Sequence, residues 1–500
     1  MIPYAEAFLL IVAFAKNPFH RTLVLTPQTT ILYLKTNDMK QIKLSLLTAI
    51  SLMLLIVWNS SCKKETTTDP QFPEESGAAS GKKSVDLGFA ENNMVMYWNE
   101  KTSIVLDAPM NPPSQARYFA IIQIAVHDAL NSIKPKFERY ALLNERKQFA
   151  SPDAAVASAA YWTIKGMNIQ GANPIDNWYN ESLALIPEGD SKEAGKALGK
   201  EAADAIIAIR STDNYDQANQ VMPGPDGTNP GEYRSTLFFS NPGMPKIKAL
   251  QLWGTLMTPF VVQSSDQFRP GAPYSVNSSQ YETDYNEVKA KGASVGHTRT
   301  ADEDEIGRFW IERQSGAWNR FVRNMIADKK MDAWKTARLF ALLHTAMMDG
   351  ITSGFEAVYH HFYWRPETSI RMTDNGNTNT ISDPNWLPSF TEIPDLTNPA
   401  FNIYSPPFPA YPNVQAGFGG AAAEILKLFF GSDVISVDQT SPITPGVIRH
   451  YSSISQAASD NSIARLYAGH NFRSACLAGE VQGKQIGNYV FNHSFRESGE

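Results

Sequence analysis

Helix-start signals that each precede an apolar pattern of helical period are the feature that most constrains this 500-residue chain. Ser151 is followed by a proline, which places a capping hydroxyl before a residue suited to the first helical turn. Thr300 stands three residues before Glu303, which is the spacing of a capping box. Asp190 precedes another glutamate by three residues and is expected to cap a helix in the same way. The sequence therefore predicts helices that begin at defined residues.

Long apolar stretches of helical period extend this pattern, and no sustained alternation of period two accompanies them. Hydrophobic residues make up 43% of the chain, enough for a large core, and two cysteines allow at most one disulfide. The sequence thus predicts an all-α protein with a helical-bundle core. Residues 211–297 and 373–412 are rich in Pro, Gly, Asn and Ser, and we expect long packed loops there. The expected helices include residues 113–129, 331–362, 415–430 and 461–490.

A short stretch near the N-terminus has the character of an export signal. Lys40 and Lys43 precede an uncharged run over residues 44–58, and small residues then lead to Cys62. This run is short for a membrane-spanning helix but suits a cleaved signal. The small residues before the cysteine resemble a bacterial lipoprotein box, although Asn59 stands where leucine is usual. We expect lipid on Cys62 to anchor an exported protein to a bacterial membrane; an uncleaved anchor or another cleavage site is the alternative.

Four segments follow from this interpretation. Residues 1–38 precede the signal without a clear role, so Met39 is the expected initiator and that segment a wrongly assigned start. Residues 39–61 are the expected signal peptide, residues 62–86 a flexible tether, and residues 87–500 the folded domain. The net charge of −6 excludes a broadly basic nucleic-acid-binding protein.

Three motifs carry a resemblance to a known family. Residues 362–371, with Arg365 and Pro366, resemble the first active-site motif of the vanadium-dependent haloperoxidases, which share their core with the type-2 phosphatidic acid phosphatases. Residues 406–412 fit the approach to the second motif, and residues 464–469 fit the third. The resemblance implies the helical bundle of that superfamily. Further similar stretches lie at residues 96–99, 116–133, 253–270 and 309–320.

The resemblance also implies an oxyanion site for vanadate or phosphate, built from Lys-x6-Arg-Pro, Pro-Ser-Gly-His and Ser-Arg-x5-His. Such an anion requires cationic donors, a hydroxyl and an axial imidazole. Arg365 and Arg465 stand at both arginine positions of the family. The lysine, the Ser-Gly-His sequence and the axial histidine are replaced, in that order, by Val358, by Asn413, Val414 and Gln415, and by Asn471.

These losses predict a catalytically degraded pseudoenzyme that acts as a binding or structural surface protein. Each charge-assisted hydrogen bond contributes about 1.5–3 kcal/mol, so losing several weakens vanadate binding by orders of magnitude. His470 lies one position before the axial site, and on a helix this turns the side chain by about 100°. The alternative is an active haloperoxidase or phosphatase rebuilt around Arg365, Arg465 and His470.

Two roles for the arginines stay open. Asn413 can cap the helix that follows it, whose first N–H groups favour an anion, and Arg365 and Arg465 would then hold phosphate, sulfate or vanadate weakly. Otherwise both arginines make structural hydrogen bonds in a filled pocket. No cofactor is expected unless the anion site persists.

The remaining candidate ligands have ordinary explanations. His127 and His344 lie in apolar helical stretches and are expected to be core residues. We find no metal-binding motif. Cys476 is expected to be a free thiol on a helix, because Cys62 would carry lipid.

Overall fold

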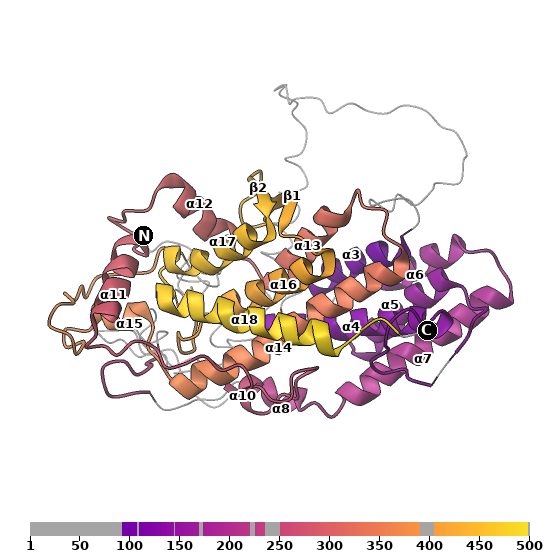
Figure 1. Ribbon diagram of the computed structural model, residues 1–500, viewed down its shortest axis with the longest axis horizontal. Helices are drawn as coiled ribbons and strands as arrows, with labels where there is room; N and C mark the ends of the chain where they lie inside the picture. The colour runs from indigo at the N-terminus through magenta and orange to yellow at the C-terminus, as the bar shows by residue number, and fades with distance from the viewer. Residues whose placement is uncertain are drawn as a thin grey trace, which may run out of the picture. The chain divides into compact units, whose positions relative to one another are not determined.

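The computed structural model of the protein describes residues 93–107, 110–144, 146–169, 174–220, 226–235, 251–390 and 405–498. The expected upstream segment, signal peptide and tether, with Cys62, lie outside these residues. No helix of the described part is long and apolar enough to cross a membrane. The described elements are almost all helices, so the predicted all-α helical-bundle fold is confirmed (Figure 1).

The first half of the described chain forms one group of packed helices. It consists of α3 (Met94–Leu106), α4 (Pro112–Ile133), α5 (Pro152–Gly166), α6 (Ile175–Ala184) and α7 (Asp190–Arg210). Helix α5 packs on α7, and α4 packs on both (Figure 1). A glycine brings α7 against α5, because a Cβ atom at Gly199 would lie 2.4 Å from the carbonyl oxygen of Ala155.

A second group of helices follows in the second half of the chain. It consists of α13 (Gln314–Ile326), α14 (Ala333–His361), α16 (Val414–Phe430), α17 (Ile454–Tyr467) and α18 (Arg473–His493). Helix α14 packs on α16 and α18 and also on α4, so it joins the two groups. Helices α16 and α18 approach closely, because a Cβ atom at Gly483 would lie 2.0 Å from the carbonyl oxygen of Gly417.

Shorter elements connect these helices, and some of them were not expected. Helix α11 (Ser279–Lys291) lies in a region predicted to be loop, with α8 (Tyr215–Ala218) and α10 (Gln251–Thr255). Strands β1 (Val434–Thr440) and β2 (Ile448–Ser453) form an antiparallel hairpin. This hairpin was not predicted, because the sequence shows no sustained period-two pattern. Strand β1 exposes four of its seven residues and β2 three of its six, so both carry little of the apolar alternation that marks a strand. The remaining elements are α12 (Ala301–Phe309) and α15 (Pro366–Arg371).

The predicted helix starts were correct in two cases and wrong in one. The Ser151 hydroxyl accepts from the N–H of Ala154, and Thr300 forms a reciprocal capping box with Glu303. Asp190 is not a cap, because it is the first residue of α7 and its helix starts without a side-chain cap. From this position its negative charge still stabilises the helix through a favourable interaction with the helix dipole.

The helix predicted over residues 461–490 is two helices. Helix α17 begins earlier, at Ile454, and residues 468–472 form a non-helical loop before α18. Gly469 in this loop has φ of +81°, a left-handed conformation that ends α17. The loop residues are buried, like those of the helices on either side, although Gly469, His470 and Asn471 interrupt the apolar pattern. Gly469 was the available signal for the end of a helix, and the prediction of one continuous helix missed it.

Two buried aspartates hold connecting loops against the helices. The Asp128 carboxylate on α4 accepts three consecutive backbone N–H groups, from residues 140–142, at 2.6–3.0 Å. The Asp349 carboxylate on α14 accepts three more, from residues 260–262, at 2.6–3.0 Å. Each carboxylate ties the backbone of a loop to its helix through three hydrogen bonds. Burial raises the pKa of Asp349, against the lowering effect of these backbone N–H groups.

Candidate functional site

The three motif regions meet at one place in the fold. Arg365 is the residue before α15, Asn413 caps α16, and Asn471 lies in the loop between α17 and α18. Arg365 contacts Asn471 directly, and the backbone N–H of Asn413 donates to the carbonyl oxygen of Ala475 in α18. The structure therefore brings together residues that the resemblance predicts to share a site.

The guanidinium of Arg365 is buried, and its donors contact neutral oxygens of the protein. Its Nε donates to the carbonyl of Phe408 at 2.7 Å, and its Nη2 to that of Pro409 at 3.1 Å. Its Nη1 donates to the carbonyl of His470 at 2.9 Å and to the Oδ1 of Asn471 at 3.1 Å. The side chain is 1% exposed and also lies 4.7 Å from the centre of the Phe408 ring. Four of its hydrogen bonds are thus made within the chain.

Asn471, which the resemblance places at the axial position, bridges two parts of this cluster. Its Oδ1 accepts from Arg365, and its Nδ2 donates to the carbonyl oxygen of Ala410 at 2.6 Å. Both ends of the amide are engaged, and the residue is buried. An amide in this arrangement connects the α17–α18 loop to the segment before α16, and it lacks the basic nitrogen of an imidazole.

His470 is buried beside this cluster, with its ring directed elsewhere. Its Nε2 lies 3.0 Å from the carbonyl oxygen of Phe390, so that nitrogen carries the proton and donates. Its backbone N–H donates to the carbonyl of Arg465. The expected turn of about 100° between positions 470 and 471 does not apply, because both residues lie in a loop and not on a helix. The backbone carbonyl of His470 accepts a hydrogen bond from Arg365.

The second motif forms the start of α16, as predicted for Asn413. Its Oδ1 accepts from the N–H groups of Gln415 and Ala416, at 2.9 and 3.3 Å. These are first-turn donors that would otherwise be available to an anion. The Gln415 side chain donates to the carbonyl of Trp310 at 2.8 Å. Val414 and Val358 are buried apolar residues in the core cluster.

Cys476 on α18 contacts the residue that caps α16, and Arg465 on α17 is close enough for its charge to act on that thiol. Arg465 is 4% exposed on α17. The Nδ2 of Asn413 donates to the Cys476 sulfur at 3.4 Å. Burial raises the pKa of the Cys476 thiol to about 12, against the opposing effects of Asn413 and the nearby arginine charges. The thiol is therefore protonated and unreactive at neutral pH, and it is free as predicted.

We find no candidate metal-binding site among the described residues. No group of three or more His, Cys, Asp or Glu side chains there is placed to hold a metal ion. His127 and His344 are fully buried, as predicted for core residues. The Nε2 of His344 lies 2.7 Å from the Oδ1 of Asn319, and its ring stacks on Phe119. Burial lowers the pKa of His344 to about 3, and the charge of Arg323 adds to this effect.

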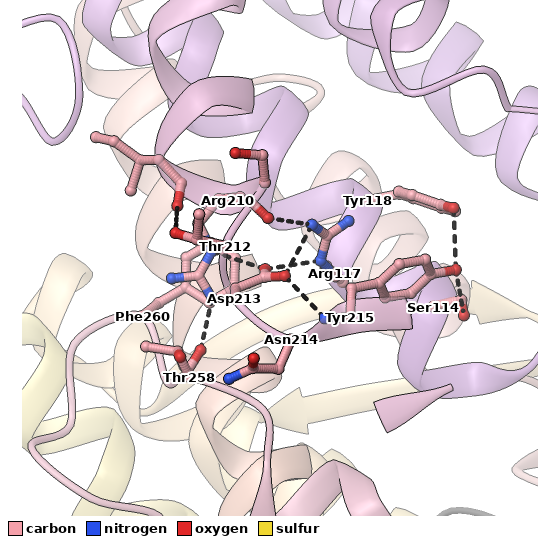
Figure 2. A network of polar contacts seen from close by, with 12 residues as sticks. Ser114, Arg117, Tyr118, Arg210, Thr212, Asp213, Asn214, Tyr215, Thr258 and Phe260 are labelled. Carbon is pink, nitrogen blue, oxygen red and sulfur yellow. Dashed lines mark hydrogen bonds and ion pairs between the residues drawn. The ribbon is translucent and has the colours of Figure 1, made fainter. Parts of the chain in front are cut away.

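A second polar cluster was missed from the sequence. Arg117 on α4 and Arg210 at the end of α7 both bind the buried carboxylate of Asp213 (Figure 2). The available signal was local, an arginine at a helix end with an aspartate three residues later. Its partner Arg117 is 96 residues away from Asp213 in the chain, so the triad could not be read from spacing.

The arrangement of the helices is that of the vanadium haloperoxidases. A solved structure of a bacterial vanadium-dependent iodoperoxidase matches with a TM-score of 0.66 at 23% identity, over 81% of this chain and 97% of that chain. A bacterial vanadium-dependent chloroperoxidase in its holo form matches with a TM-score of 0.58 at 14% identity, over 77% and 94%. The described residues thus share the fold of this class of enzyme.

Sequence comparisons find similarity to the same class of enzyme. A family model described as the VCPO second helical-bundle domain matches residues 338–498, a range that includes all three motif regions. The vanadium chloroperoxidase of Curvularia inaequalis is 23% identical over an alignment of 494 residues, which covers 76% of this chain and 78% of that protein. Together with the fold, these findings support the predicted resemblance to the vanadium haloperoxidase superfamily, and the family model itself covers residues 338–498.

Proposed function

We propose that this chain is an exported, lipid-anchored member of the superfamily that has lost catalysis and acts as a binding or structural surface protein. The observation that supports this most directly is the environment of Arg365. Its guanidinium donates four hydrogen bonds to oxygens of the chain itself. In an oxyanion site, such donors would face the anion.

The residues present do not fit a bound vanadate or phosphate. Neutral side chains stand at the lysine position, Val358, and at the two histidine positions, Gln415 and Asn471. The first-turn N–H groups of α16 are capped by Asn413. An entering anion would have to displace the acceptors of Arg365, and buried acceptors left without a donor cost about 1–3 kcal/mol each. We therefore assign no catalytic step through such a group.

A rebuilt active site around Arg365, Arg465 and His470 has less support. A general base or nucleophile needs a nitrogen directed at the substrate. The His470 Nε2 is directed at the carbonyl of Phe390, and the residue is fully buried. No described residue contributes a second histidine to this cluster.

Activity assays test the proposal. The full chain is incubated with vanadate, bromide and peroxide, and separately with a phosphomonoester, beside a vanadium chloroperoxidase as positive control. We expect no turnover above the protein-free rate in either assay. Turnover that Arg365→Lys reduces and Arg473→Lys leaves unchanged would overturn the proposal, because Arg473 binds Glu287 outside this cluster.

Vanadate titration tests the weak anion site by itself. We expect no saturable binding to the parent chain at millimolar vanadate. Saturable binding that is lost in Arg365→Lys, with the fold intact by circular dichroism, would restore the anion-site interpretation.

The lipid anchor is tested by labelling. We propose that Cys62 carries the lipid, because small residues precede it after an apolar run. Bacterial cells expressing the chain are fed radiolabelled palmitate, and membranes are separated from soluble protein. Label and membrane association are expected in the parent and in Cys476→Ser, and both should disappear in Cys62→Ser. Label retained by Cys62→Ser would exclude this anchor.

A further inference from the structure

A hollow of about 580 Å³ lies beside the arginine–aspartate triad, among helices α4, α7 and α8. We call it the α4–α8 hollow. Its wall includes Arg117 and Tyr118 from α4, Ile207 and Arg210 from α7, and Tyr215 from α8. Its volume is in the range of pockets for small molecules. None of these residues belongs to the cluster around Arg365.

The triad carries a net positive charge at the wall of the hollow. Asp213 accepts from the Nε of Arg117 at 2.9 Å and from the Nε of Arg210 at 3.0 Å. The other nitrogens of Arg210 donate to the carbonyls of Thr258 and Pro259, at 2.6 and 3.2 Å. Two guanidinium groups therefore share one carboxylate, which leaves one positive charge uncompensated within the triad.

One nitrogen of Arg117 is available to a ligand. Its Nε and Nη2 bind Asp213 and the carbonyl oxygen of Arg210. Its Nη1 makes no hydrogen bond to the described residues. The residue is 6% exposed, so this donor lies on a buried group that forms the wall of the hollow. A buried guanidinium with an unused N–H favours an anionic acceptor.

Hydroxyl groups and apolar side chains complete the wall. The Tyr215 hydroxyl lies 3.0 Å from those of both Tyr118 and Ser114 (Figure 2). The Arg117 guanidinium lies 4.4 Å from the centre of the Tyr215 ring, which keeps it in place. Ile121 and Ile207 add aliphatic surface to the same hollow.

We propose that the α4–α8 hollow binds a small organic carboxylate. The carboxylate would accept from Nη1 of Arg117 and from a tyrosine hydroxyl, and the apolar part would contact Ile121 and Ile207. The aliphatic wall favours an organic anion over inorganic phosphate. Asp216 also borders the hollow, but it is exposed, and water screens its charge more than that of the buried triad.

Calorimetric titration of the full chain tests this site. The probes are benzoate and hexanoate, with benzamide and hexanamide as uncharged analogues of the same shape. We expect saturable binding of at least one carboxylate, and binding of its amide at least about tenfold weaker, because one charge-assisted hydrogen bond is lost. Arg117→Gln should weaken the carboxylate by a similar factor.

A filling variant keeps the test independent of the triad. Ile207→Trp fills the hollow and leaves Arg117 and Asp213 intact, and we expect it to weaken carboxylate binding at least about tenfold. Ile209→Trp is the matched control, because Ile209 lies on the same helix, is 46% exposed and does not border the hollow. Equal binding of acids and amides, equal affinity of the two tryptophan variants, or no saturable binding would each overturn the proposal.

Discussion

Replacing Arg365 by alanine separates a structural arginine from an anion ligand. The side chain makes four hydrogen bonds to oxygens in residues 408, 409, 470 and 471. A buried hydrogen bond contributes about 1 kcal/mol net, so four give about 4 kcal/mol, and orphaned carbonyl groups add to the loss. This is a large part of the 5–15 kcal/mol that typically stabilises a folded protein.

The measurement is urea unfolding followed by circular dichroism. We expect Arg365→Ala to lower the free energy of unfolding by about 4 kcal/mol. If that variant does not fold, Arg365→Lys provides a second measurement. One ammonium reaches fewer of these oxygens, so we expect its free energy of unfolding to fall by about 2 kcal/mol. Arg473→Ala is the control, with an expected loss below about 1 kcal/mol, because Arg473 pairs with Glu287 while 39% exposed. A loss below about 1 kcal/mol for Arg365→Ala would refute the structural role.

Three further predictions concern buried groups. Asp349→Asn should lower the free energy of unfolding by about 2–3 kcal/mol in urea, because an amide offers one acceptor oxygen to three N–H groups; an unchanged midpoint would contradict this. His344 has a pKa of about 3 in the folded chain, so its neutral form is retained there while the unfolded chain gains a proton below about 6.5. The free energy of unfolding should therefore decrease as the pH is lowered from 6.5 to 3, by up to about 1.4 kcal/mol per pH unit. His344→Gln should make this dependence on pH weaker, and an equal dependence in the two chains would argue against the reasoning. In the Cys62→Ser chain, Cys476 should not react with iodoacetamide at pH 8 until urea unfolds the protein, and rapid labelling of the folded chain would show that the thiol is not buried.

Much of the fold was predictable because its signals are local. Ser151 and Thr300 act on N–H groups within three residues, so a cap can be recognised from spacing alone. Helix α14 and the cap of α16 at Asn413 were predicted for the same reason. The break at residues 468–472 was missed although Gly469 is a local stop signal, because one glycine also occurs inside helices and only the packing shows where the chain turns.

The sequence by itself determined the helical class, and its motifs predicted which residues share one place in the fold. Only the tertiary structure decided what Arg365 binds, because its acceptors lie 43 to 106 residues away in the chain. The same holds for Arg117. It binds the carboxylate of Asp213, on the loop after α7, and Arg210 binds the same carboxylate. Hydrogen-bond partners of a buried charge are set by how the helices pack, and no local pattern in the sequence records them.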